Sequence, residues 1–169
     1  MNKRFVTHLD LLRRVEPASW IEVLEGEGGD VEAFISTFNC VVTNGCFDIL
    51  HPGHLKLLES VSAIAEAFDY WPIIALNSDE SIRKIKGATR PIVPQNSRAK
   101  LLTSLEKPFT VIIFDEETPQ RVMDLLRPKF VVKGLDYAAS DVVRWKDSNV
   151  ISVPLEDGWS TTSILERNR

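Results

Sequence analysis

Short, continuous apolar runs alternate with segments of helical apolar spacing from residue 40 to the end of the chain. Runs that are apolar along their whole length are typical of parallel strands covered by helices on both faces of a sheet. Because parallel crossovers are right-handed, the alternation predicts an α/β fold, a Rossmann-like three-layer sandwich with a five-stranded parallel sheet. The predicted strands are residues 40–47, 72–79, 109–116, 129–137 and 149–158, and the predicted helices are 54–68, 96–106, 118–128 and 160–169.

The first 39 residues follow a different pattern. They contain short stretches of helix-like apolar spacing interrupted by an acidic, glycine-rich break, EGEGGD, at residues 25–30. A segment of this length is too short to bury a core of its own. We therefore expect residues 1–39 to be an N-terminal helical extension that packs on a single domain formed by residues 40–169.

Composition narrows the class of protein. A net charge of −4 and a pI of about 5.4 give no reason to expect a nucleic-acid partner or an anionic membrane surface. No apolar stretch reaches the roughly 18 residues of a membrane-spanning helix, and the N-terminus is a poor signal peptide. Cys40 and Cys46 lie on one predicted strand, about 20 Å apart, too far to form a disulfide. Two free thiols favour a cytoplasmic location.

Two of the three histidines lie within the sequence NGCFDILHPGH, at the junction of the first strand and the first helix. Pro52 suits the first helical position, and Gly53 permits close approach of a ligand to the backbone. A helix N-terminus attracts anions, so His51 and His54 could complete a phosphate cradle. The alternatives are a capping and packing role or, less favoured because only Cys46 is close by as a further ligand, a zinc site.

A basic segment follows the second predicted strand, and we expect its first part, ESIRKIKGATRPIVP at residues 80–94, to form a loop before the predicted helix 96–106. The stretch RKIKGATRPIVPQNSRAK, residues 83–100, carries six cations and no acid in a chain of net negative charge. It should lie at the same sheet edge as the histidines, where a triphosphate would explain both features, although a solvated basic loop remains the alternative. The cations are Arg83, Lys84, Lys86, Arg90, Arg98 and Lys100.

Polar residues follow several strands. The STT sequence at residues 160–162 places hydroxyl groups at a helix start, where they could bind phosphate or simply cap the helix. Asp48, Asp79 and Asp136 each follow a strand and could hold Mg²⁺, bind a ribose hydroxyl or form a turn. The chain contains neither a P-loop nor a G-x-G-x-x-G motif, and Cys46 is typical of a small core residue.

Taken together, these motifs resemble a known family. GCFDILHPGH resembles the G-x-F-D-x-x-H-x-G-H signature of the cytidylyltransferase-like nucleotidyltransferases, and STTSIL is similar to their C-terminal S-T-T-x-I signature. Residues 40–167 also look like the adenylyltransferase domain of bifunctional heptose kinase/adenylyltransferases. The resemblance implies the HxGH nucleotidyltransferase fold. It also implies catalytic roles for His51 and His54, which would contact the nucleotide phosphates, and for Lys86, which would neutralise them.

Further site residues are carried over from the resemblance alone, and no metal ligand is among them. The resemblance implies substrate-side contacts for Asp48, Asn77, Asp79 and Arg90. It implies nucleotide or phosphate binding by Asn44, Gly45, Cys46, Phe47, Gly53, Lys84, Arg98, Asp136, Ser160, Thr161 and Thr162.

The implied reaction joins AMP from ATP to a sugar 1-phosphate, with heptose 1-phosphate as the implied acceptor, and releases pyrophosphate. Mg²⁺ would arrive with the triphosphate, and the partners would be small molecules only, with no nucleic acid and no membrane. Relatives are often dimers, which makes a homodimer the assembly to test. One alternative is a CTP-dependent enzyme acting on glycerol 3-phosphate or another alcohol phosphate. A second is a nucleotide-binding module without turnover.

Overall fold

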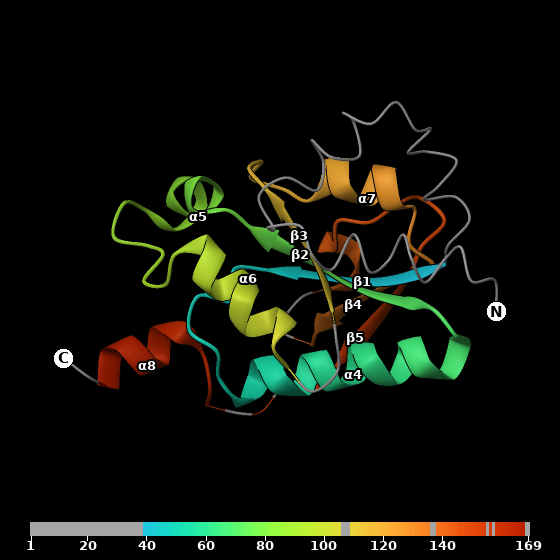
Figure 1. Ribbon diagram of the computed structural model, residues 1–169, viewed down its shortest axis with the longest axis horizontal. Coiled ribbons are helices and arrows are strands. Elements are labelled where there is room, and N and C mark those ends of the chain that lie inside the picture. Colours follow the sequence, from blue (N-terminus) through green and yellow to red (C-terminus); the bar gives the residue numbers. More distant parts are fainter. Residues whose placement is uncertain (1–38, 106–108, 136–137, 155, 157, 168–169) are drawn as a thin grey trace.

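A parallel sheet of five strands forms the centre of the molecule, as the sequence predicts. The computed structural model describes residues 39–105, 109–135, 138–154, 156 and 158–167. The strand order is β3-β2-β1-β4-β5, and every neighbouring pair is parallel (Figure 1). The strands are β1 (Cys40–Gly45), β2 (Trp71–Asn77), β3 (Thr110–Phe114), β4 (Phe130–Gly134) and β5 (Asn149–Val153).

Helices connect the strands. They are α4 (Pro52–Phe68), α5 (Asp79–Lys86), α6 (Gln95–Thr103), α7 (Gln120–Leu126), the short 3₁₀ helix η2 (Ala139–Asp141) and α8 (Thr161–Arg167). Figure 1 shows α5, the start of α6 and α8 gathered at the end of the sheet toward which the β1 and β2 arrows point. Residues that follow the carboxyl ends of the strands therefore meet at one edge.

The structure corrects the prediction of a loop directly after β2, because α5 occupies the first half of that segment. The Ser78 hydroxyl accepts a hydrogen bond from the Ser81 N–H and caps the helix. Asp79 and Glu80 lie in the first turn and the basic residues in the last, so the charges complement the helix dipole. Ile82 is the only apolar side chain that α5 buries, which is why apolar spacing did not reveal the helix.

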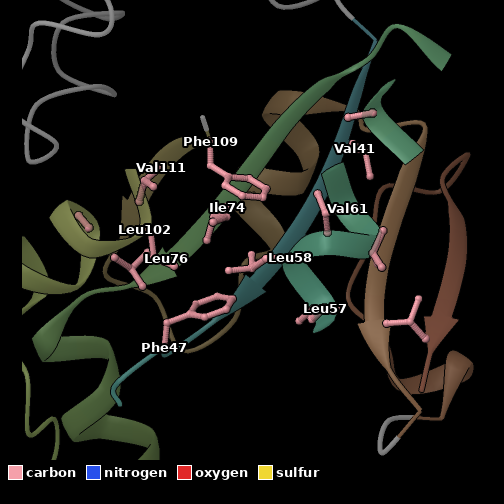
Figure 2. Packing of buried hydrophobic residues seen from close by; sticks show 14 residues of the cluster. Val41, Phe47, Leu57, Leu58, Val61, Ile74, Leu76, Leu102, Phe109 and Val111 are labelled. Atoms are coloured by element: carbon pink, nitrogen blue, oxygen red, sulfur yellow. The ribbon is translucent and has the colours of Figure 1, made fainter. Parts of the chain in front are cut away.

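One face of the sheet is covered by α4 and α6. Figure 2 shows Leu57, Leu58 and Val61 of α4 pointing toward the strands, beside Leu102 of α6. Burial of side chains this large contributes about 1.5–3 kcal/mol each, so this layer fixes the position of the α4 N-terminus. Its buried strand residues are Val41, Ile74, Leu76, Val111, Val132 and Val153.

The opposite face of the sheet is covered by α7 and by the chain that returns from β4 to β5. Val122, Met123 and Leu126 of α7 pack with Val142 on the alternate side chains of the strands.

Among the described residues no helix is long and apolar enough to cross a membrane. Cys40 and Cys46 are both free thiols, as their spacing predicts. The predicted N-terminal extension, up to residue 38, lies outside the described residues.

The strand order places the topological switch point of the sheet between β1 and β4. The chain runs outward from β1 through β2 to β3, and then returns to the other side of β1 for β4 and β5. Ligands of open parallel sheets bind at such a switch point. The β1–β4 ladder extends only over the pairs Val41–Phe130 and Val42–Val131, whereas β1 pairs with β2 as far as Gly45. The two strands therefore part before their ends.

Candidate active site

The chain leaves β1 through a strained turn. Phe47 has a φ of 46°, in the left-handed region that costs a bulky residue free energy and is found preferentially at functional sites. Its ring is buried against Leu58 in the core (Figure 2). A Cβ atom at Gly45 would lie 3.2 Å from that ring, so glycine allows the close approach. The Phe47 side chain thus serves the core and leaves the backbone as the predicted floor.

His51 and His54 form a stacked pair at the N-terminus of α4. Their ring centroids are 3.7 Å apart with 25° between the ring planes. His51 is the N-cap residue, and its Nδ1 accepts a hydrogen bond of 3.4 Å from the backbone N–H of His54. An imidazole that accepts at Nδ1 carries its proton at Nε2, which is then available as a donor. A Cβ atom at Gly53 would lie 3.2 Å from the His51 ring, a tight contact that glycine avoids.

Both imidazoles are held in the neutral form near pH 7. Burial lowers the pKa of His54 to about 4, with a smaller lowering effect from His51, against a hydrogen bond with the Ile49 backbone that raises it. Burial also lowers the pKa of His51. Among the described residues no hydrogen-bond partner reaches the buried Nδ1 of His54. The pair is suited to donate or accept single hydrogen bonds rather than to supply positive charge.

Asp48 fastens the segment after α5 to the β1 turn. Its carboxylate, with no exposed side-chain surface, forms an ion pair with Arg90. The other carboxylate oxygen accepts hydrogen bonds of 2.8 Å from the Ile92 N–H and 2.9 Å from the Val93 N–H. Asp48 and Arg90, both predicted on the substrate side, are therefore brought together and bind each other.

Arg98 is enclosed by protein, and the phosphate contact that the resemblance implies for it stays a prediction. Its side chain has no exposed surface. Nη1 donates to the carbonyl oxygens of Cys46 at 2.7 Å and Asn77 at 2.8 Å, and Nε donates to the Val93 carbonyl oxygen at 2.8 Å. Nη2 forms an ion pair of 2.7 Å with Asp79. Arg98 thus joins the ends of β1 and β2 to the basic segment.

Asn77 and Asp79 are also held by protein groups. Asn77 is buried, and its Nδ2 donates a hydrogen bond of 2.9 Å to the Ser81 hydroxyl. The Asp79 carboxylate is one-quarter exposed beside Arg98, and its backbone N–H donates to the Gln95 side chain. These contacts fix the carboxyl end of β2, and substrate contacts of Asn77 and Asp79 stay predictions.

The two predicted lysines differ in position. Lys84 forms an exposed ion pair of 2.7 Å with Glu80, and that hydrogen bond raises its pKa. Lys86 ends α5 and lies near the Cys46 thiol, since its charge acts to lower the pKa of Cys46, although burial outweighs that effect and raises the pKa. The charges of Arg90 and Arg98 also act to lower the pKa of the Cys46 thiol. Half-buried Cys46 therefore lies near three cations and the Asp48 carboxylate, whose charge acts in the opposite direction.

The C-terminal hydroxyl segment meets the start of α4. The Trp159 carbonyl oxygen would lie 3.7 Å from a Cβ atom at Gly53. Ser160 caps α8 through a reciprocal pair of 3.0 Å hydrogen bonds with Ser163. Thr161 is half-buried and Thr162 is exposed. The segment is thus at the predicted place, whereas Asp136 lies outside the described residues.

Sequence reasoning missed Lys133 of β4. It is nine-tenths buried, and its Nζ donates a hydrogen bond of 2.7 Å to the Asn44 carbonyl oxygen at the end of β1. The signal was a lysine within the otherwise apolar run FVVKG. Asn44 itself has a buried side-chain Oδ1 that no described group reaches.

Comparison with known proteins identifies the family. The family model described as "Cytidylyltransferase-like" matches residues 42–164, which include both histidines and the STT segment. The chain belongs to the cytidylyltransferase-like family. The family predicted from the motifs is therefore confirmed, as is the α/β fold with a parallel sheet.

Curated relatives of this cytidylyltransferase-like chain carry the name "Bifunctional protein HldE". The protein from Koribacter versatilis (strain Ellin345) is 42% identical over 132 residues, covering 75% of this chain and 26% of its own length. The protein from Rhodopseudomonas palustris (strain BisA53) is 37% identical over 175 residues, covering 96% of this chain and 35% of its own length. That from Aliarcobacter butzleri (strain RM4018) is 44% identical over 128 residues, covering 75% and 26%. The chain thus spans about a quarter to a third of these relatives.

Solved structures share the fold. The lipopolysaccharide core biosynthesis protein from Thermoplasma volcanium GSS1 aligns with a TM-score of 0.57 at 20% identity, over 71% of this chain and 99% of that one. A macrolide-efflux protein from Streptococcus pneumoniae aligns with a TM-score of 0.56 at 22% identity, over 76% of this chain and 51% of that one. At these identities the two structures support the architecture of this cytidylyltransferase-like domain only.

Proposed function

We propose that this chain is a nucleotidyltransferase that joins AMP from ATP to heptose 1-phosphate, giving ADP-heptose and pyrophosphate. The observation that carries the proposal is the stacked pair of His51 and His54, which lies beside a cationic segment fastened to the same turn. The resemblance to heptose kinase/adenylyltransferases and the curated relatives named HldE support the choice of acceptor and of ATP.

The chemistry follows from charge. An oxygen of the sugar 1-phosphate is already anionic at pH 7, so the reaction needs no general base. This oxygen attacks the α-phosphorus of ATP in line, the bond from that phosphorus to the bridging oxygen of the β-phosphate breaks, and pyrophosphate leaves. The protein has to hold two polyanions together and stabilise the charge on the equatorial oxygens.

The described residues divide these tasks. His51 and His54, neutral near pH 7, contact the phosphates from the start of α4, and His51 does so with its Nε2–H as the donor. Lys86 supplies positive charge from the end of α5. Asp48 and Arg98 act as positioning residues, because both are enclosed and hold the backbone around that charge. Ser160, Thr161 and Thr162 offer the C-terminal hydroxyl groups.

Magnesium would enter with the triphosphate as part of the substrate. Within the described ranges, no group of three or more His, Cys, Asp or Glu side chains could hold a metal ion. Mg²⁺ keeps several waters and is commonly bound through substrate phosphates, which fits a site that provides few carboxylates. Bound there, it would neutralise charge on the departing pyrophosphate.

Pyrophosphate release tests the proposal. The purified chain is incubated with Mg²⁺ and either ATP or CTP, each crossed against heptose 1-phosphate, glucose 1-phosphate and glycerol 3-phosphate. We expect the fastest release with ATP and heptose 1-phosphate. Preference for CTP with glycerol 3-phosphate would instead establish the cytidylyltransferase alternative. A folded protein that binds nucleotide but releases no pyrophosphate with any pair would establish a binding module without turnover.

A further inference from the structure

We infer that Lys133 is a positioning residue that spans the switch point between β1 and β4 and holds the end of β1 in place. This inference rests on the proposed function for its kinetic consequence, but its structural basis is independent. The backbone ladder between β1 and β4 stops at the pair Val42–Val131. Asn44 and Lys133 each lie two residues further along, where the strands have parted and the Lys133 ammonium reaches the Asn44 carbonyl oxygen at 2.7 Å.

This hydrogen bond crosses the switch point of the sheet at the level of the site. On the side away from this hydrogen bond, each strand is paired as far as its end. β1 pairs with β2 as far as Gly45, and β4 pairs with β5 as far as Gly134. Each strand is thus secured to its outer neighbour, while the backbone ladder between β1 and β4 ends at the pair Val42–Val131. The Lys133 side chain joins the two strands beyond the end of that ladder.

The burial of Lys133 argues against a role in packing alone. Lys133 is 9% exposed, and removing an ammonium from water costs free energy that its polar contacts have to offset. An apolar side chain of similar length would pack in the strand without that cost. The feature that lysine adds is a donor long enough to reach across to β1.

The consequence concerns the floor of the site. The residues that follow Asn44 are the strained turn at Phe47 and the carboxylate of Asp48 that fastens the basic segment. The Cys46 carbonyl oxygen is held by Arg98 from the β2 side. Lys133 holds the same stretch from the β4 side, so the backbone beneath the nucleotide is fixed on both sides. Misplacement by about 1 Å can cost a reaction roughly 100-fold in rate.

Three variants of the full chain test the inference. Lys133→Met keeps an unbranched side chain and removes the donor, whereas Lys133→Gln keeps an N–H donor without the charge. Lys129→Met is the matched control, because Lys129 is exposed just before the opposite end of β4. Amide hydrogen exchange of peptides covering residues 43–48 is measured without substrate, and kcat and KM are measured with ATP and the best acceptor.

For Lys133→Met we expect exchange over residues 43–48 to accelerate at least about tenfold and kcat to fall about 10- to 100-fold, with KM for ATP changed less than about threefold. Lys133→Gln and Lys129→Met should stay within about fivefold of the unaltered chain in both measurements. Unchanged exchange in a folded Lys133→Met variant would overturn the inference.

If Lys133→Met does not fold, Lys133→Gln decides the matter. Protected exchange with near-normal kcat supports a positioning role. Protected exchange with kcat reduced about 100-fold overturns it, because the charge would then act on the ligand directly. Absence of activity in the unaltered chain would reject the proposed function alone, since the exchange measurement needs no substrate.

Discussion

Single side chains at this site serve two separate purposes. His51, His54 and Lys86 present groups that can meet phosphate, whereas Asp48 and Arg98 have no exposed side-chain surface and hold backbone. Asp48 and Arg98 therefore affect the reaction indirectly, through the backbone and side chains that they hold in place. Substitutions of the first kind should therefore reduce turnover with little loss of stability, and those of the second kind should reduce both.

The first residue-scale prediction concerns turnover. We expect His54→Ala or Lys86→Ala to lower kcat about 100-fold or more, the scale for losing a preorganised donor to the transition state. Steady-state pyrophosphate release measures the effect, and circular dichroism confirms the fold. Lys56→Ala, at an exposed position of α4, is the control. Near-normal kcat in both variants would contradict the assignment of the site.

A second prediction at this scale concerns pH. The folded pKa of His54 is about 4, below the 6.5 of an ordinary histidine, so its protonation favours the unfolded chain. The stability this gives is complete above pH 6.5 and is lost as the pH falls toward 4. Relative to His54→Gln, the unfolding free energy of the unaltered chain should drop by up to about 3 kcal/mol over this window.

Urea unfolding of both proteins at several pH values measures that difference. The comparison removes the titration of carboxylates, which the two chains share. A difference that stays constant from pH 7 to pH 4 would show that the His54 ring is not kept neutral by burial.

At the scale of elements, the segment from α5 to α6 is the part of the fold that the site depends on most. It is short of apolar side chains, so polar contacts hold it in place: Asp48 from the β1 turn and Arg98 from α6. Both contacts converge on Val93, through its N–H and its carbonyl oxygen respectively. The segment is thus secured at one point from two elements.

The first element-scale prediction concerns Arg98. We expect Arg98→Met to lower the unfolding free energy by about 3–5 kcal/mol, because Asp79 and three carbonyl oxygens lose a buried partner. Arg98→Lys should recover only part of the unfolding free energy lost in Arg98→Met, since lysine lacks the planar guanidinium group. Arg121→Met removes an exposed pair with Glu116 and should cost at most about 1 kcal/mol. Chemical denaturation measures all three; equal losses would contradict the role of Arg98.

The second element-scale prediction concerns Asp48. Asp48→Asn removes the charge that pairs with Arg90 and weakens the hydrogen bonds from Ile92 and Val93. We expect faster amide exchange over residues 88–94 and a fall in kcat of about tenfold or more. Asp124→Asn, on the exposed side of α7, is the control. Unchanged exchange over residues 88–94 would show that the segment is held by other contacts.

For the molecule as a whole, the sheet order decides where function is possible. Placing β1 between β2 and β4 brings the α4 start, the end of α5 and the Trp159–Ser160 segment to one edge. A ligand bound there contacts elements far apart in the chain and should stabilise the whole domain. A homodimer stays a prediction, to be tested by the mass of the chain in solution.

Ligand binding gives the prediction at this scale. ATP with Mg²⁺ at about 100 times its dissociation constant should add about 2.7 kcal/mol of stability, which corresponds to a rise in Tm of roughly 5–10 °C. CTP at the same concentration should raise Tm less, and Lys86→Ala should reduce the effect of ATP. Differential scanning fluorimetry measures the shift. A larger rise with CTP than with ATP would favour the cytidylyltransferase alternative.

The sequence by itself determined the class of fold and the family, and it predicted the groups that bind phosphate. Apolar runs of strand length and short signatures are local patterns, so they can be read without the fold. The helix α5 escaped detection because charge and capping, rather than apolar spacing, define it. Only the tertiary structure decided which polar groups are enclosed. It enclosed Arg98 as a link between the ends of β1 and β2, and it brought Lys133 to Asn44 from 89 positions away. Such roles depend on which strands are neighbours, and no local pattern specifies that.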